Sequence, residues 1–287
     1  MTGVYARLIL VATLVFAVTA PVHAGDVDTQ FLFGFTQGTD VGELGEREFE
    51  SQTIGRFGKG EGSYAAVTSQ LRMEYTPFPD LRVEAGMFVG YHDVSGVSEL
   101  DDRSVLQFGG FVAEARYRLL NRRTAPIGLT LGIEPHWARF DDISGEFASN
   151  FGGDIIVAID KELVEDRLYA AANVLYGAEW TYLFSSGSAQ QQSTFTLSAA
   201  LTAQLKEGIF FGLETHYVRA FEGIGLNAFL GDAWFVGPTT YLRLSKSFAV
   251  SAAWSIQIAG GAINLPGSFN LRDFERNKFR LRLEYTF

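Results

Sequence analysis

The last eleven residues, Asn277-Lys-Phe-Arg-Leu-Arg-Leu-Glu-Tyr-Thr-Phe287, alternate strictly between polar and apolar side chains. Neighbouring side chains of an extended strand point to opposite faces, so one face of this segment is apolar and the other is charged. A soluble sheet rarely buries a charged face, whereas a barrel strand in a membrane turns that face to a wet lumen and its apolar face to lipid. The segment therefore predicts a transmembrane β-barrel. The apolar face comprises Phe279, Leu281, Leu283, Tyr285 and Phe287, and the polar face comprises Lys278, Arg280, Arg282, Glu284 and Thr286.

Residues 1–24 have the pattern of a cleaved secretory signal peptide. Arg7 supplies the positive charge, residues 8–20 form a short apolar run, and Val22-His-Ala24 fits a small-residue cleavage site. The run is too short to cross a membrane as a helix. We therefore expect export, one barrel domain in residues 25–287, and a location in the bacterial outer membrane.

The composition excludes several classes of function. The chain has no cysteine, which excludes disulfides and thiol chemistry. Without Arg7 of the signal peptide, 22 Lys and Arg face 33 Asp and Glu, a net charge of −11, and this argues against nucleic acid as a partner. After residue 24 no apolar stretch is long enough for a spanning helix. A membrane protein without such helices must be a closed barrel, because lipid satisfies no open strand edge.

Twelve alternating segments predict an all-β fold, an antiparallel up-and-down barrel with the even strand number of bacterial barrels. The breaks between them alternate between short and long, which indicates short periplasmic turns and longer extracellular loops. The longest predicted loop spans residues 38–63, and it either folds inward as a constriction or covers the mouth. The predicted strands are residues 29–37, 64–76, 81–92, 104–118, 126–140, 152–160, 167–183, 193–205, 208–220, 232–244, 247–259 and 277–287.

The ending Leu283-Glu-Tyr-Thr-Phe287 resembles the C-terminal signal of Gram-negative outer-membrane β-barrel proteins. Tyr285 and Phe287 stand at the two matching aromatic positions. The resemblance implies insertion by the barrel-assembly machinery through this strand, with outer-membrane lipid and lipopolysaccharide as further partners. It does not identify a cargo.

The inward positions of the predicted strands form two unlike walls, one charged and one of small polar residues on residues 193–205 and 247–259. One interpretation is a pore with a basic excess for small anionic or dipolar solutes. The other is a ladder of ion pairs that fills a narrow barrel, since one hairpin register sets Glu74 beside Arg82 and Arg72 beside Glu84. The charged wall comprises Arg72, Glu74, Arg82, Glu84, Glu114, Arg116, Arg118, Lys278, Arg280, Arg282 and Glu284.

Residues 128–139 align without gaps on residues 208–219, and each copy contains a Glu-x-His pair. Glutamate and histidine are apt metal ligands, and histidine titrates near neutral pH. The two strands lie a third of the barrel apart, too far to share one ion, so we expect no metal and no cofactor. The pairs either titrate and gate transport or remain as structural traces of hairpin duplication. They are Glu134 with His136 and Glu214 with His216.

These patterns favour a passive diffusion channel or transporter for small polar or anionic solutes. The first alternative is a non-conducting barrel that serves envelope structure, adhesion or export. A lipid-modifying enzyme is the less favoured alternative, because the lipid hydrolases of the outer membrane carry a serine two residues after a histidine. In this chain Val94, Ala138 and Val218 stand at those positions, so we expect no catalytic residues.

Overall fold

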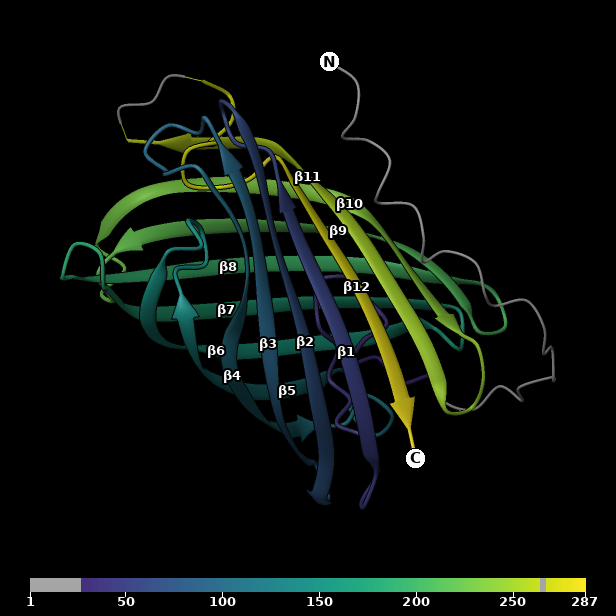
Figure 1. Cartoon of the computed structure of the whole chain (residues 1–287). Helices are drawn as coiled ribbons and strands as arrows, with labels where there is room; N and C mark the ends of the chain where they lie inside the picture. The colour runs from purple at the N-terminus through teal and green to yellow at the C-terminus, as the bar shows by residue number, and fades with distance from the viewer. Residues whose placement is uncertain (1–26, 264–266) are drawn as a thin grey trace, which may run out of the picture.

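The computed structural model describes residues 27–263 and 267–287, which form a closed antiparallel barrel of twelve strands (Figure 1). Each strand pairs with its neighbours along the chain, and the first strand pairs with the last. The predicted signal peptide, residues 1–24, lies outside the described residues. The strands are β1 (Arg47–Phe57), β2 (Ser63–Phe78), β3 (Leu81–Ser95), β4 (Arg103–Leu120), β5 (Gly128–Phe140), β6 (Phe147–Val164), β7 (Leu168–Leu183), β8 (Ser188–Lys206), β9 (Ile209–Glu222), β10 (Ala228–Arg243), β11 (Phe248–Ala262) and β12 (Asn277–Thr286).

Side-chain exposure on the strands is the reverse of that in a soluble sheet. On β2, Leu71 and Met73 are 48% and 58% exposed, whereas Arg72 and Glu74 between them are buried. The charged residues point into the barrel and the apolar residues point out, as the alternation predicts. The described residues contain no helix that is long and apolar enough to cross a membrane.

The first strand is not where the sequence pattern placed it. We expected a strand at residues 29–37 and a long loop at 38–63, but β1 begins at Arg47 and pairs with β12 and β2. Residues 27–41 instead fold inside the barrel without forming a strand, and the partly exposed residues 42–46 lead on to β1. We call residues 27–46 the N-terminal plug. Figure 1 shows this segment in purple behind β1. The expected loop is reduced to the turn at 58–62.

The connections lie at two ends of the barrel. The turn end contains the short connections at 79–80, 121–127, 165–167, 207–208 and 244–247. The loop end contains 58–62, 96–102, 141–146, 184–187, 223–227 and 263–276. Most loop-end connections are shorter than expected because the strands extend further, as in β6, which begins at Phe147 instead of residue 152.

A hydrophobic core fills the turn end of the lumen. Leu32 and Phe33 of the plug are almost fully buried there against Tyr169, Phe210 and Tyr241, which project inward from β7, β9 and β10. Burial of a large apolar side chain stabilises a fold by about 1.5–3 kcal/mol. Hydrophobic burial therefore contributes to the stability of the docked plug, as it does in the core of a soluble protein.

Candidate functional site

A cavity of about 600 Å³ occupies the lumen between the plug and the loop end. Phe31, Phe35 and Gln37 of the plug line its floor. Residues 141–143 and 272–275, from two loop-end connections, line its roof. We call this cavity the chamber. Its volume lies within the range of small-molecule sites, about 300–1,000 Å³.

Polar contacts tie the plug to the charged side of the barrel. Arg116 on β4 donates hydrogen bonds to the Gln37 side chain at 2.8 Å and to the Gly38 carbonyl at 2.6 Å. Asp160 on β6 accepts from the Thr39 amide at 3.0 Å and from its hydroxyl at 2.6 Å. Because each bond has a charged partner, each is stronger than a neutral hydrogen bond.

Glu214 on β9 anchors the middle of the plug. Its Oε2 accepts hydrogen bonds from the backbone amides of Phe35, at 2.7 Å, and Thr36, at 3.1 Å. The neighbouring His216 packs edge-on against the Phe35 ring, with centroids 5.3 Å apart. Among the described residues, neither ring nitrogen of His216 has a hydrogen-bond partner. This Glu-x-His pair therefore binds the plug.

Two carboxyl groups within the plug respond oppositely to their surroundings. Burial opposes ionisation of Asp40, but the Arg122 guanidinium outweighs that effect and holds the pKa of Asp40 below its usual value. For Asp28, burial and the charge of Asp40 outweigh the opposing charge of Arg82 and raise its pKa to about 7. Of these two groups, Asp40 is therefore ionised in the docked plug, whereas Asp28 is half protonated near neutral pH.

Carboxylates lie side by side across six neighbouring strands. Val112 faces His136 and Ala115 faces Ile133, which places Glu114 opposite Glu134. Like charges at directly opposed positions destabilise a sheet, so this row needs compensation from cations. Within the described residues, the acidic row runs from β1 to β6 through Glu48, Glu74, Glu84, Glu114, Glu134 and Asp154.

Arginines from adjacent register positions compensate the acidic row. Arg72 Nη1 lies 3.3 Å from Glu84 and 2.8 Å from Glu134. Arg82 Nη1 lies 2.9 Å from Glu74. Both ion pairs expected at the β2–β3 hairpin therefore form, but in a different register. Glu74 stands directly opposite Glu84, and the arginines reach the carboxylates diagonally.

The basic residues of β12 each lie over an aromatic ring. The ring face attracts the cation electrostatically, and the cation can still form ion pairs or hydrogen bonds with other groups. Two of the three rings belong to the plug, so the plug helps to hold the basic wall of the chamber. The pairs are Lys278 over Phe235 at 4.4 Å, Arg280 over Phe35 at 5.0 Å and Arg282 over Phe31 at 4.0 Å.

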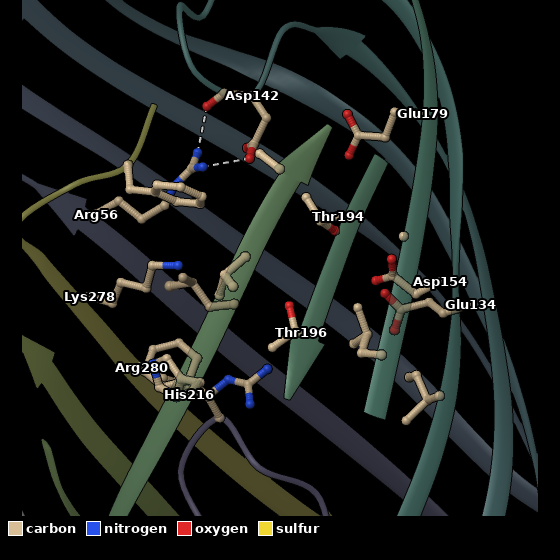
Figure 2. A pocket seen from close by; sticks show the side chains of 18 of the residues that line it. Arg56, Glu134, Asp142, Asp154, Glu179, Thr194, Thr196, His216, Lys278 and Arg280 are labelled. Carbon is tan, nitrogen blue, oxygen red and sulfur yellow. Dashed lines mark hydrogen bonds and ion pairs between the residues drawn. The ribbon is translucent and has the colours of Figure 1, made fainter. Parts of the chain in front are cut away.

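The opposite wall of the chamber is acidic and polar (Figure 2). Glu134, Asp154 and Glu179 project from β5, β6 and β7 toward Lys278 and Arg280 across the cavity. Hydroxyl and amide side chains of β8 fill the space beside them. The chamber therefore has a transverse field between a basic and an acidic face. The β8 residues that line it are Gln190, Gln192, Ser193, Thr194, Thr196 and Ser198.

An ion pair between Arg56 of β1 and Asp142 of the β5–β6 connection, with N and O 2.7 Å apart, bridges the roof of the chamber. Burial opposes ionisation of Asp142, but the Arg56 charge outweighs it and lowers the pKa of Asp142. Beside this pair, burial lowers the pKa of Lys59 to about 8. Lys59 donates to the Arg272 carbonyl at 2.9 Å and links the turn at 58–62 to the β11–β12 connection.

The structure separates the predicted site residues into groups with different contacts. Arg82, Arg116 and Arg118 contact the plug or its continuation toward β1. Lys278 and Arg280 line the chamber. Arg72, Glu84, Glu114 and Arg282 of the predicted charged wall also line the chamber. Glu74 and Glu284 are buried and do not line it.

The two Glu-x-His pairs are not equivalent in the structure. Glu134 pairs with Arg72 and lines the chamber, and His136 Nε2 lies 3.8 Å from Glu179. His216 of the other pair also lines the chamber. Glu214 and His216 hold the plug. In the described part of the chain, no group of three or more potential ligands is arranged to hold a metal ion.

Several residues of the site were not predicted. Glu48, Glu50 and Arg56 fell in the expected loop 38–63, where alternation was not considered. Asp154 and Glu179 lie on expected strands at inward positions. The alternation of those strands was sufficient to identify them, because Ile155 and Trp180 beside them are lipid-facing.

The closed twelve-stranded barrel with a charged lumen defines the class of the protein as an outer-membrane β-barrel. A family model described as a family of unknown function (DUF6662) matches residues 26–287, and the chain belongs to this family. A comparison with curated proteins gave no match.

Solved outer-membrane barrels share the fold. The COG4313 outer membrane channel from Pseudomonas putida F1 is 15% identical, with a TM-score of 0.60, and the match covers 87% of this chain and 98% of that one. The NanC porin is 12% identical, with a TM-score of 0.48, and the match covers 83% of this chain and 98% of that one. At this identity the likeness to the Pseudomonas channel establishes the fold.

Proposed function

We propose that the protein is an outer-membrane channel for small polar solutes, with the chamber as the selective part of its path. The observation that carries this proposal is the chamber itself, a cavity of about 600 Å³ with opposed charged faces. An internal ladder of ion pairs that only filled the barrel would leave no such space. Charged faces across a pore favour solutes that complement them.

Passage through the channel requires the plug to move. The plug occupies the turn end, which we assign to the periplasm, and buries Leu32 and Thr29 completely. Its contacts are partly apolar and partly charge-assisted hydrogen bonds. In an undocked conformation, water would replace the hydrogen-bond partners and the apolar side chains would lie in the periplasm. The roof, closed by Arg56 and Asp142, would form the opposite gate.

The proposal is tested by single-channel recording in planar bilayers on refolded protein. We expect low or intermittent conductance from the intact mature chain. A variant that lacks residues 27–41 should give a larger and steadier conductance, because β1 and the barrel wall are unchanged. A variant that carries Glu165→Gln, in an exposed turn outside the lumen, serves as the control and should behave as the intact chain does.

The absence of conductance in both the intact and the plug-deleted protein would overturn the proposal. That result would favour the second candidate function, a non-conducting barrel of the cell envelope, for which the buried plug is the supporting observation. A lipid-modifying enzyme would be indicated by turnover of phospholipid or lipid A by the purified barrel.

A further inference from the structure

Arg280 faces the chamber with an incompletely satisfied guanidinium group. Its Nη1 donates to the Gly34 carbonyl at 2.9 Å, and the group lies over the Phe35 ring. No carboxylate of the described residues forms an ion pair with it within 4.0 Å, and its Nε has no hydrogen-bond partner there. Arginine presents several donors in a planar fork that fits a carboxylate. Arg280 is therefore prepared for an anionic group that the described chain does not supply.

Asp154 is the counterpart of Arg280 on the acidic face. Within residues 27–263 and 267–287, neither a hydrogen bond nor an ion pair reaches its carboxylate. The strand opposite carries Gly177 at this level, and a Cβ there would lie 2.5 Å from Asp154 Oδ1. The missing side chain on β7 therefore leaves room for the Asp154 carboxylate at the chamber wall.

The two groups face each other across the lumen. Arg280 lies on β12 and Asp154 on β6, which are six strands apart in a ring of twelve and so occupy opposite walls. Figure 2 shows both side chains directed into the cavity, with Thr196 of β8 between them in the view. A solute that spans the chamber would therefore meet Arg280 at one end and Asp154 at the other.

The other described charges that line the chamber have a hydrogen-bond or ion-pair partner, except Glu99, which is exposed at the loop end. Pairing within the protein removes the need for a solute to neutralise them, so Arg280 and Asp154 stand out among the chamber charges of the described chain. The satisfied contacts are Glu134 with Arg72 at 2.8 Å, Glu179 with Asn150 at 3.0 Å, Lys278 with Glu275 at 3.2 Å and Arg282 with Glu50 at 3.0 Å.

We infer that the chamber binds a zwitterionic solute, a small amino carboxylate whose carboxylate pairs with Arg280 and whose ammonium pairs with Asp154. A buried charge without a partner is costly. A zwitterion supplies both missing partners and adds no net charge, whereas an anion or a cation of the same size supplies one and leaves the other unpaired. The inference rests on the proposed function, since it assigns the solute class of the same chamber.

Equilibrium binding to the intact mature barrel in detergent tests the inference, measured by isothermal titration calorimetry. The probes are the linear amino carboxylates glycine, 3-aminopropanoate, 4-aminobutyrate and 6-aminohexanoate, which vary the distance between the charges. Butyrate and butylamine are the singly charged controls. We expect one length of zwitterion to bind at least about tenfold more tightly than either control, the gain typical of one charge-assisted hydrogen bond.

Two substitutions test which residue binds the ammonium group of the solute and which binds its carboxylate. Asp154→Asn should weaken the best zwitterion about tenfold and leave butyrate unchanged. Arg280→Gln should weaken both the zwitterion and butyrate. Glu165→Gln, in the exposed turn, is the matched control and should change neither. If Arg280→Gln does not fold, Asp154→Asn alone decides, because the Asp154 carboxylate makes no contact within the described chain.

Equal affinity for zwitterions and singly charged probes, or a zwitterion affinity that Asp154→Asn leaves unchanged, would overturn the inference. Liposome-swelling assays with the same solutes separate it from the channel proposal. Binding without swelling would remove the channel and keep the site, whereas swelling without selective binding would keep the channel and remove the site.

Discussion

Glu134 and Glu214 occupy equivalent positions in the duplicated segments but have different partners. Glu214 accepts two backbone hydrogen bonds from the plug, whereas Glu134 pairs with Arg72 on the chamber wall. The difference arises because the plug lies beside β9 at the level of Glu214, whereas it contacts β5 at Thr130, away from Glu134. The role of each glutamate is therefore set by what lies against its strand, and the repeated motif supplies only the side chain.

The plug is expected to undock more often in the Glu214→Ala variant. The substitution leaves the amides of Phe35 and Thr36 without their acceptor, at a cost of about 1–3 kcal/mol for each donor. Because the chain has no cysteine, Thr36→Cys supplies a single thiol at a position only 1% exposed. The rate of maleimide labelling at this thiol should rise about tenfold or more in the Glu214→Ala background.

The duplication supplies the matched control for this experiment. Glu134→Ala removes the same side chain from the equivalent position of β5, where no plug amide is bound. Labelling of Thr36→Cys should stay at its original rate in that background. Equal acceleration by both substitutions would show that the anchoring role assigned to Glu214 is wrong.

At the scale of the element, β2 to β12 follow the alternation of the sequence closely, whereas β1 does not. The outward face of β1 carries Ser51, Thr53 and Gly55, which are too small and polar to mark a lipid-facing strand. Alternation detects a strand through the contrast between its two faces. Where the outward face is weakly apolar, that contrast disappears and a strand is mistaken for a loop.

The plug was mistaken for a strand for the complementary reason. Its sequence Phe31-Leu-Phe-Gly-Phe35 is rich in residues that favour strands. In the structure Leu32 and Phe33 pack against the inward aromatic residues of β7, β9 and β10. Sequence pattern shows that such residues are buried, but it does not distinguish lipid from a lumenal core as the apolar surroundings.

The docking of the plug is expected to weaken as pH rises from 4 to 7. Asp28 has a pKa of about 7 in the docked plug and 3.8 as its ordinary value. The docked state thus favours the protonated carboxyl, and its stabilising effect is complete below pH 3.8 and is lost as pH rises through about 7. Labelling of Thr36→Cys, normalised to the unfolded protein at each pH, should accelerate over this range.

Asp28→Asn removes the titrating group and should flatten this pH dependence. The pKa of Asp40 is lowered, so the stability that Asp40 contributes is lost only as pH falls below its ordinary range, outside the window of the experiment. A pH dependence that persists unchanged in Asp28→Asn would assign the effect to another group.

At the scale of the whole molecule, the sequence predicted a charged lumen but did not predict the chamber. Arg72, Glu84 and Arg280 were identified as inward residues by alternation alone. The chamber exists because the plug forms its floor and the loop-end connections form its roof. Both depend on how non-strand segments fold back into the barrel, for which the period of two residues carries no information.

Assembly of the barrel is expected to depend on its last residue. Phe287 is 59% exposed, stacks with Tyr285, and donates its backbone amide to Arg47 across the β12–β1 seam. Phe287→Ala should lower the amount of folded barrel in outer-membrane fractions severalfold, as the resemblance to the assembly signal implies. Heat-dependent gel mobility of the fractions measures the folded amount.

Phe78→Ala is the control for this prediction. Phe78 is an exposed aromatic residue on β2 at the same end of the barrel, but it lies outside the C-terminal strand. Its substitution should leave the folded amount close to that of the unmodified protein. A similar loss in both variants would indicate a general need for aromatic residues at this end and no special role of Phe287.

The attachment of the plug to β1 gives the barrel a direction. The plug joins β1 at Arg47, at the turn end, and its twenty residues reach roughly 65 Å when extended. When it leaves the lumen through that end, it remains covalently tethered there. A push on the plug from the loop end would move it out of the lumen at the turn end. A push from the turn end would move it further into the chamber. On the proposed channel function, the plug would therefore act as a gate that stays attached to the barrel wall.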